Sequence, residues 1–112
     1  MDGYKLNRIN NDVMRELTDV LRSVKDPRVT GMLTIVKVNV TNDLSFCDVY
    51  VSSIDGIEHA KEAVKGLKSA SGFIRTELSH RLKIRKTPQL RFIADDSIEI
   101  SSDIIKMLKD LN

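Results

Sequence analysis

At 112 residues the chain is long enough for one domain, which we expect to span residues 1–112, and its charged residues leave a formal net charge of only +2. Hydrophobic residues make up 41% and aromatic residues 4%, without a Trp, so a core of Val, Ile and Leu is expected. A single cysteine excludes an internal disulfide framework, no apolar run approaches the roughly 20 residues of a membrane-spanning helix, and the first residues lack a secretory signal pattern. We therefore expect a cytoplasmic protein without a membrane partner. We also expect a monomer, since no apolar face is left over.

An amphipathic helix is predicted over residues 4–24. Apolar side chains recur there at helical spacing, at Leu6, Ile9, Val13, Leu17, Val20 and Val24. Four basic residues lie off this stripe: Lys5, Arg8, Arg15 and Arg22. Pro27 disfavours helical geometry at Asp26, so the helix is expected to end near Lys25.

Two strands and a turn are predicted next. In residues 32–41, apolar and polar side chains alternate, with Val36, Val38 and Val40 on one face. Residues 46–52 alternate again, with Cys47, Val49 and Val51 on one face. Because residues 42–45 have the composition of a turn, the two strands are expected to form an antiparallel hairpin.

Helical spacing returns over residues 57–83, at Ala60, Val64, Leu67, Ile74, Leu78 and Leu82. The stripe is interrupted at residues 69–72, where Gly and Ser weaken a helix, so either two helices meet at a kink or one helix bends. A third strand is predicted over 89–94, after Pro88, and a last helix over 97–111, with Ser97 as its cap. The predicted class is α+β, with element order α-β-β-α-(kink)-α-β-α.

The sequence offers little for catalysis. His59, His80 and Cys47 do not have the spacing of a zinc site, and no phosphate-binding loop, dinucleotide fingerprint or nucleophile elbow is present. We interpret Cys47 as a buried, inert thiol. Asp95 and Asp96 follow a strand, where an active site can lie, but we favour a role in ending the strand and capping the next helix. Neither an enzyme nor a bound cofactor or metal is expected.

Positive charge is concentrated in residues 61–91, which carry nine basic and two acidic side chains. On a helix, one stripe would contain Lys61, Lys65, Lys68, Gly72 and Arg75. The small residues of its centre are Ser69, Ala70, Ser71 and Gly72, and the charge extends through Arg81, Lys83, Arg85 and Lys86. Small residues flanked by Lys and Arg let a sugar–phosphate backbone come close to the protein main chain.

Two interpretations of this segment stay open. A solvated helix face, with a Gly-Ser kink that only turns the chain, would explain any single Lys. The whole segment favours a polyanion partner, and the scarcity of aromatic residues favours a protein that recognises the shape and phosphates of RNA over one that recognises single-stranded bases. A protein–protein module with an acidic partner is a further alternative.

The predicted order of elements resembles the bacterial-type KH domain, in which a G-x-x-G loop usually joins the central helices. Here the junction reads Ser69-Ala70-Ser71-Gly72, an interrupted helix of the Ala-x-Gly kind. This variant resembles the ribosome-binding factor A family. The resemblance covers about residues 5–108 and rests on further matching stretches at 25–29, 38–43, 49–52, 67–75, 85–92 and 95–99.

The resemblance implies a KH type II-like fold, with a three-stranded sheet and helices packed on one face. It also implies a non-catalytic factor that binds the small ribosomal subunit and its rRNA, assists late maturation and 5′-end processing, and supports growth at low temperature. Its implied contacts are Ala70, Gly72, Lys68 and Arg75, with Arg28, Arg85 and Lys86 as further phosphate contacts. The chain departs from the family pattern at 100–102, where an aromatic-Gly pair is expected, and contacts of the C-terminal tail of some members are not expected. A KH-type RNA-binding protein without ribosome specificity is the first alternative.

Overall fold

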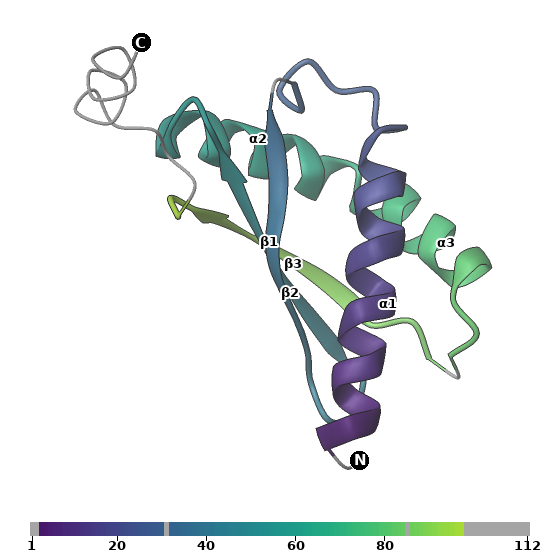
Figure 1. Ribbon diagram of the computed structural model, residues 1–112. Coiled ribbons are helices and arrows are strands. Elements are labelled where there is room, and N and C mark those ends of the chain that lie inside the picture. Colours follow the sequence, from purple (N-terminus) through teal and green to yellow (C-terminus); the bar gives the residue numbers. More distant parts are fainter. Residues whose placement is uncertain (1–2, 31, 85, 98–112) are drawn as a thin grey trace, which may run out of the picture.

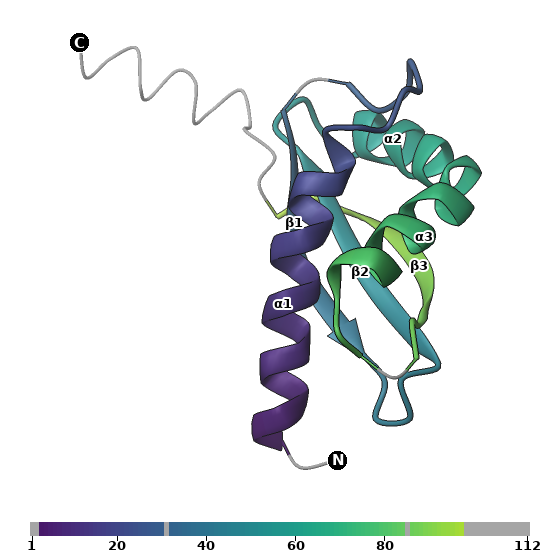
Figure 2. The same cartoon turned by 90° about the vertical axis from the view of Figure 1, so that its right-hand side faces the viewer.

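The computed structural model describes residues 3–30, 32–84 and 86–97. Its elements are α1 (Gly3–Leu21), β1 (Leu33–Val40), β2 (Phe46–Ser53), α2 (Ile57–Ser69), α3 (Ser71–Arg81) and β3 (Gln89–Asp95). The strands form one sheet in the order β1-β2-β3, and the helices pack on one face of it, as predicted (Figures 1 and 2). All but the first residue of the helix predicted over 97–111 lies outside the described residues.

The sheet is mixed. β1 and β2 are antiparallel, which confirms the predicted hairpin, and β3 runs parallel to β2. Because parallel neighbours need a long crossover connection, α2 and α3 both lie between these strands in the chain. α1 lies against β1, and α2 lies against β3 and β2.

One detail of the predicted sheet is wrong. Val36 was expected on the buried face with Val38 and Val40, but it is only partly buried, and Ile35 enters the core in its place. The pairing with β2 shifts between Ile35 and Lys37, as at a β-bulge. The inserted residue changes which side chains face the helices, because successive side chains in a strand point to opposite faces.

The core lies between the helices and the sheet. Most of the buried side chains lie on the predicted stripes, including Val13 and Leu17 from α1 and Ile74 and Leu78 from α3, and Cys47 is fully buried among them. Three residues of the stripe predicted on the first helix are only partly buried: Leu6, Ile9 and Val24. Leu82 is only partly buried, since α3 ends one residue before it.

The opposite face of the sheet has no helix over it among the described residues (Figure 1). Its polar and aromatic side chains contact one another. Arg91 bonds Asp48, with Nε 2.6 Å from Oδ1, and its guanidinium lies 4.4 Å from the centroid of the Phe46 ring. Lys37 lies over the Tyr50 ring at 5.6 Å. These cations are therefore separated by the sheet from the basic side chains of α2 and α3.

Candidate functional site

The interrupted helix is two helices. α2 ends at Ser69, α3 begins at Ser71, and Ala70 alone lies between them, with φ −94° and ψ 8° (Figure 2). The Ala70 N–H donates to the carbonyls of Gly66 and Leu67, at 3.1 Å each. The break is therefore a one-residue kink in which the main chain keeps hydrogen bonds.

The two serines of the kink bond the end of α2. The Ser69 hydroxyl donates to the carbonyl of Lys65 at 3.2 Å, and the Ser71 hydroxyl donates to the carbonyl of Lys68 at 2.7 Å. The last four carbonyls of a helix have no partner within it, so the Ser71 hydroxyl supplies a donor to one of them, at Lys68. Lys65 precedes these four, and the Ser69 hydroxyl adds a bond within the last turn of α2. Both serines stabilise the kink itself.

Gly72 is exposed, and nothing in the described structure requires a glycine there. A Cβ built on it would have no neighbour within 4 Å, and its φ is not in the left-handed region. Because glycine destabilises a helix by roughly 1 kcal/mol relative to alanine, its presence in α3 is unfavourable for the fold alone. What the glycine does provide is main chain that a partner can approach closely.

The basic stripe on α2 has both paired and unpaired charges. Lys61 forms an ion pair with Glu58 at 3.3 Å, and Lys65 with Glu62 at 2.9 Å. These pairs are exposed, so each contributes little and can exchange for a phosphate. Lys68, next to the kink, is exposed and forms no ion pair with any residue that the structure describes. The uncompensated charge of this stripe therefore lies beside the kink.

Arg28 is brought to the kink from the loop after α1. Its Nη2 donates to Ser69 Oγ at 3.2 Å, across 41 positions of sequence, and also to Asp26 Oδ2 at 2.9 Å. Hydrogen bonds from the side chain and main chain of Arg28 lower the pKa of Asp26 from 3.8 to about 2, and the same pair raises the pKa of Arg28. The guanidinium is therefore held beside the kink, with its charge largely balanced by Asp26.

The other predicted contacts on this side are spread over the next segment. Arg75 lies one turn after the kink, and its Nη2 donates to the carbonyl of Thr87 at 2.9 Å. Lys86 lies at the far end of the sheet, with Nζ 3.4 Å from Ser45 Oγ in the hairpin turn. Arg85 lies outside the described residues. The main chain of Arg75 is thus near the kink, but its guanidinium lies beside Thr87, the residue after Lys86, whose own ammonium group lies at the hairpin turn.

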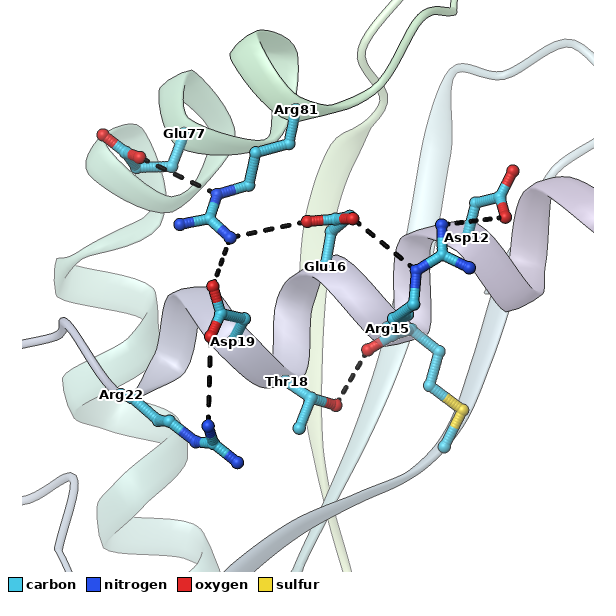
Figure 3. Close-up of polar contacts among 9 residues, drawn as sticks. Asp12, Arg15, Glu16, Thr18, Asp19, Arg22, Glu77 and Arg81 are labelled. Atoms are coloured by element: carbon cyan, nitrogen blue, oxygen red, sulfur yellow. Dashed lines mark hydrogen bonds and ion pairs between the residues drawn. The ribbon is translucent and has the colours of Figure 1, made fainter.

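Arg81 is held by carboxylates between α1 and α3 (Figure 3). Its Nη1 bonds Asp19 and lies 3.4 Å from Glu16 Oε2, and its Nε lies 4.0 Å from Glu77 Oε2. The hydrogen bond from Arg81 is the largest cause of a lowered pKa at Asp19. The structure therefore assigns Arg81 to a contact between two helices, which makes it the weakest of the predicted phosphate contacts.

A second basic surface, which the sequence pattern does not predict, faces a hollow of about 610 Å³ between α1 and the segment after α3. It contains Lys83, which was predicted as a contact, and cations from α1 that were noted only as lying off the apolar stripe. The residues that line it are Lys5, Arg8, Ile9, Asp12, Arg15, Arg81, Leu82, Lys83 and Ile84. The spacing of the basic residues on α1 was the only signal for it in the sequence.

The other candidate groups have structural partners. Burial is the largest cause of the rise in the pKa of Cys47 to about 12, as expected for an inert thiol. His59 Nε2 donates to the carbonyl of Thr30 at 2.7 Å, and Asp95 accepts from the Ser97 N–H at 2.7 Å. Within the described part of the chain, no group of three His, Cys, Asp or Glu side chains could hold a metal ion, and none of its helices is long and apolar enough to cross a bilayer.

Comparisons with known proteins agree on one family. The sequence model of the ribosome-binding factor A family matches residues 5–108 of this chain. Ribosome-binding factor A of Clostridium novyi (strain NT) is 41% identical over 112 residues, which cover 99% of this chain and 93% of that protein. The crystal structure of ribosome-binding factor A from Thermus thermophilus matches with a TM-score of 0.71 and 26% identity, over 80% of this chain and 93% of that one. A homology model of the Thermus thermophilus protein, fitted into a cryo-electron microscopy map of its 30S complex, matches with a TM-score of 0.63 and 27% identity, over 75% and 88% of the two chains.

Proposed function

The chain belongs to the ribosome-binding factor A family, and from that premise we propose that it is a non-catalytic assembly factor that binds the small ribosomal subunit through its rRNA. It acts in the cytoplasm as a monomer of one domain, without a cofactor, a small-molecule substrate or a membrane. It assists late maturation of the rRNA, including 5′-end processing, and this assistance matters most at low temperature. The related Thermus thermophilus protein has been fitted into a map of its 30S complex, which supports the choice of subunit.

One observation carries the proposed contact site. Gly72 is exposed in a helix where its absent side chain would touch nothing, and it stands beside a lysine without an ion-pair partner among the described residues, Lys68. A phosphate that approaches the bare main chain at Gly72 would meet the charge of Lys68 from one side and Arg75 from the other. Phosphate contacts of this kind position a protein on RNA without reading its sequence.

The proposed mechanism is a shift between rRNA conformers. A protein can move such an equilibrium only by the difference between its affinities for the two conformers. Two helices joined by a hydrogen-bonded kink form a rigid surface, which suits one arrangement of phosphates better than another. When the rRNA reaches an arrangement that fits this surface less well, the factor is released.

Co-sedimentation with mature and immature small subunits, over a series of salt concentrations, tests the proposal. We expect wild type to bind with an affinity that falls as salt rises, and Lys68→Glu to weaken binding and reduce the slope of log affinity against log salt by about 1 or more. Lys68→Glu/Arg75→Glu is expected to abolish binding. Lys37→Glu is the matched control, because it reverses an exposed charge on the opposite face of the sheet.

Three outcomes would count against the proposal. If wild type binds no small-subunit particle even at low salt, the ribosome is not the partner. Equal binding to unrelated structured RNA would favour a KH-type RNA-binding protein without ribosome specificity. Binding to subunits that survives ribonuclease treatment would favour a protein partner with an acidic surface.

A further inference from the structure

We propose that Phe73 and the hollow beside it hold one unpaired RNA base, next to the phosphate contact at the kink. The proposal rests on the proposed function and adds to it a contact with a base. By itself, the scarcity of aromatic residues in the sequence favours recognition of shape and phosphates alone.

Phe73 is the most exposed aromatic side chain that the structure describes. It is 47% exposed, although it lies on α3 between the core residue Ile74 and the exposed Gly72. The other described phenylalanines have partners: Phe92 is in the core, and Phe46 lies under Arg91. Among the side chains that the structure describes, folding therefore leaves one aromatic ring largely open, and it is at the kink.

The ring borders a hollow of about 470 Å³ between the end of α1 and the kink. Its lining combines apolar groups, from Val24, Ala70 and Phe73, with polar ones. The polar groups are the hydroxyls of Ser23 and Ser69, the cation Lys25 and the carboxylate of Asp26, whose charge is paired with Arg28. This mixture of apolar and polar groups matches a nucleic-acid base, which has flat apolar faces and polar edges. Sites for small organic groups have volumes of roughly 300–1,000 Å³ and a similar mixture of groups.

Charge favours RNA over an apolar peptide as the occupant. Lys25, which lines the hollow, and Lys68, which directly precedes Ser69, are both exposed, and neither forms an ion pair with a residue among those described. Phe73 directly follows Gly72 on α3, so the ring is close to the main chain that the proposed phosphate contact uses. Unpaired bases are commonly held in this way, because every base has a face that can stack on an aromatic ring.

The chain contains no Trp, so Phe73→Trp places a single fluorescent reporter at the proposed site while keeping a ring that can stack. We expect this variant to bind free small subunits at least as tightly as wild type, with its emission quenched on binding. Phe73→Ala and Phe73→Leu are both expected to weaken binding by about 5- to 100-fold, the effect of losing one stacked base. Ile93→Ala, which truncates an exposed apolar residue on the opposite face of the sheet, is the control and should bind as wild type does.

The results that differ from these expectations distinguish failure of the base site from failure of the proposed function. If Phe73→Ala binds like wild type while Lys68→Glu does not bind, or if Phe73→Trp binds without a change in emission, the base site is wrong and the proposed function stands. If Phe73→Leu binds like wild type while Phe73→Ala does not, the hollow takes an apolar group that needs no stacking. If the Phe73 variants lose affinity for intact subunits but not for protein-free small-subunit rRNA, the occupant is a ribosomal protein. A wild type that binds no subunit rejects the proposed function as well as the base site. Thermal unfolding of each variant confirms that it is folded.

Discussion

Val29 lies so close to Gly66 that a Cβ on the glycine would stand 2.8 Å from Cγ2 of the valine. The Cβ on Gly66 would also be 3.0 Å from Oδ1 of Asp26. The loop after α1 therefore rests directly on the main chain of α2. This close approach places Arg28, which lies between Asp26 and Val29 in the loop, against Ser69 at the kink.

Gly66→Ala and Gly72→Ala form a matched pair, since each adds one methyl group to a helix. We expect Gly72→Ala to raise the free energy of unfolding by up to about 1 kcal/mol, because alanine is the better helix former and the methyl group meets nothing. Gly66→Ala should be less stable than Gly72→Ala by about 1–3 kcal/mol, because its methyl group overpacks the loop. Urea unfolding followed by circular dichroism measures both. Equal stability of the two variants would contradict the close approach at Gly66.

Arg81→Gln tests the contact between α1 and α3. Arg81 is 30% exposed and bonds Asp19 and Glu16 across more than 60 positions of sequence, so its loss should lower the free energy of unfolding. Arg22→Gln is the control, because Arg22 is 78% exposed and the ion pair that it forms with Asp19 is 3.9 Å long. The difference between the two variants should shrink at high salt, which screens exposed charges. The ion-pair assignment fails if the variants unfold alike at low salt.

Acid should destabilise the protein through two carboxyl groups. Hydrogen bonds from Arg28 to Asp26, and from Ser45 and Thr41 to Asp43, lower each pKa from 3.8 to about 2. Because the folded pKa is below the unfolded one, this stabilisation is fully present above about pH 4 and is lost as the pH falls toward 2. Unfolding in urea at several pH values between 6 and 2 measures it. Asp26→Asn and Arg28→Gln remove opposite ends of one pair, so both should flatten the pH dependence, and curves parallel to wild type would rule the pair out.

Cys47 should report on unfolding. Its side chain is fully buried and burial raises its pKa to about 12, so the native protein should not react with a thiol reagent at pH 8. In denaturant, one thiol per chain should react. Cys47→Ser should lose about 1–3 kcal/mol of stability, because it places a hydroxyl in an apolar core. Cys47→Ala should lose less than Cys47→Ser, because it adds no polar group. Rapid labelling of the native protein would show that the thiol is accessible.

The local elements of this protein could be predicted from its sequence because each leaves a periodic pattern. Helical spacing in α1 and alternation in β2 identified both elements and their buried faces to within a few residues. The concentration of basic residues identified the α2–α3 segment as the candidate site, and Gly and Ser located its kink. The alternation failed only at Val36, because a bulge changes the face of a strand without changing its composition.

The tertiary structure decided which charges lie together. Arg28 reaches Ser69 across 41 positions, and Arg81 reaches Glu16 across 65, so neither pairing has a local pattern. It also left Phe73 exposed, although its neighbour Ile74 is buried, since the packing of α3 on the sheet selects which side chains are covered. A backbone period is a property of consecutive residues and can be read along the chain. The partner of a charged side chain depends on how the helices and strands pack, which the whole chain determines together.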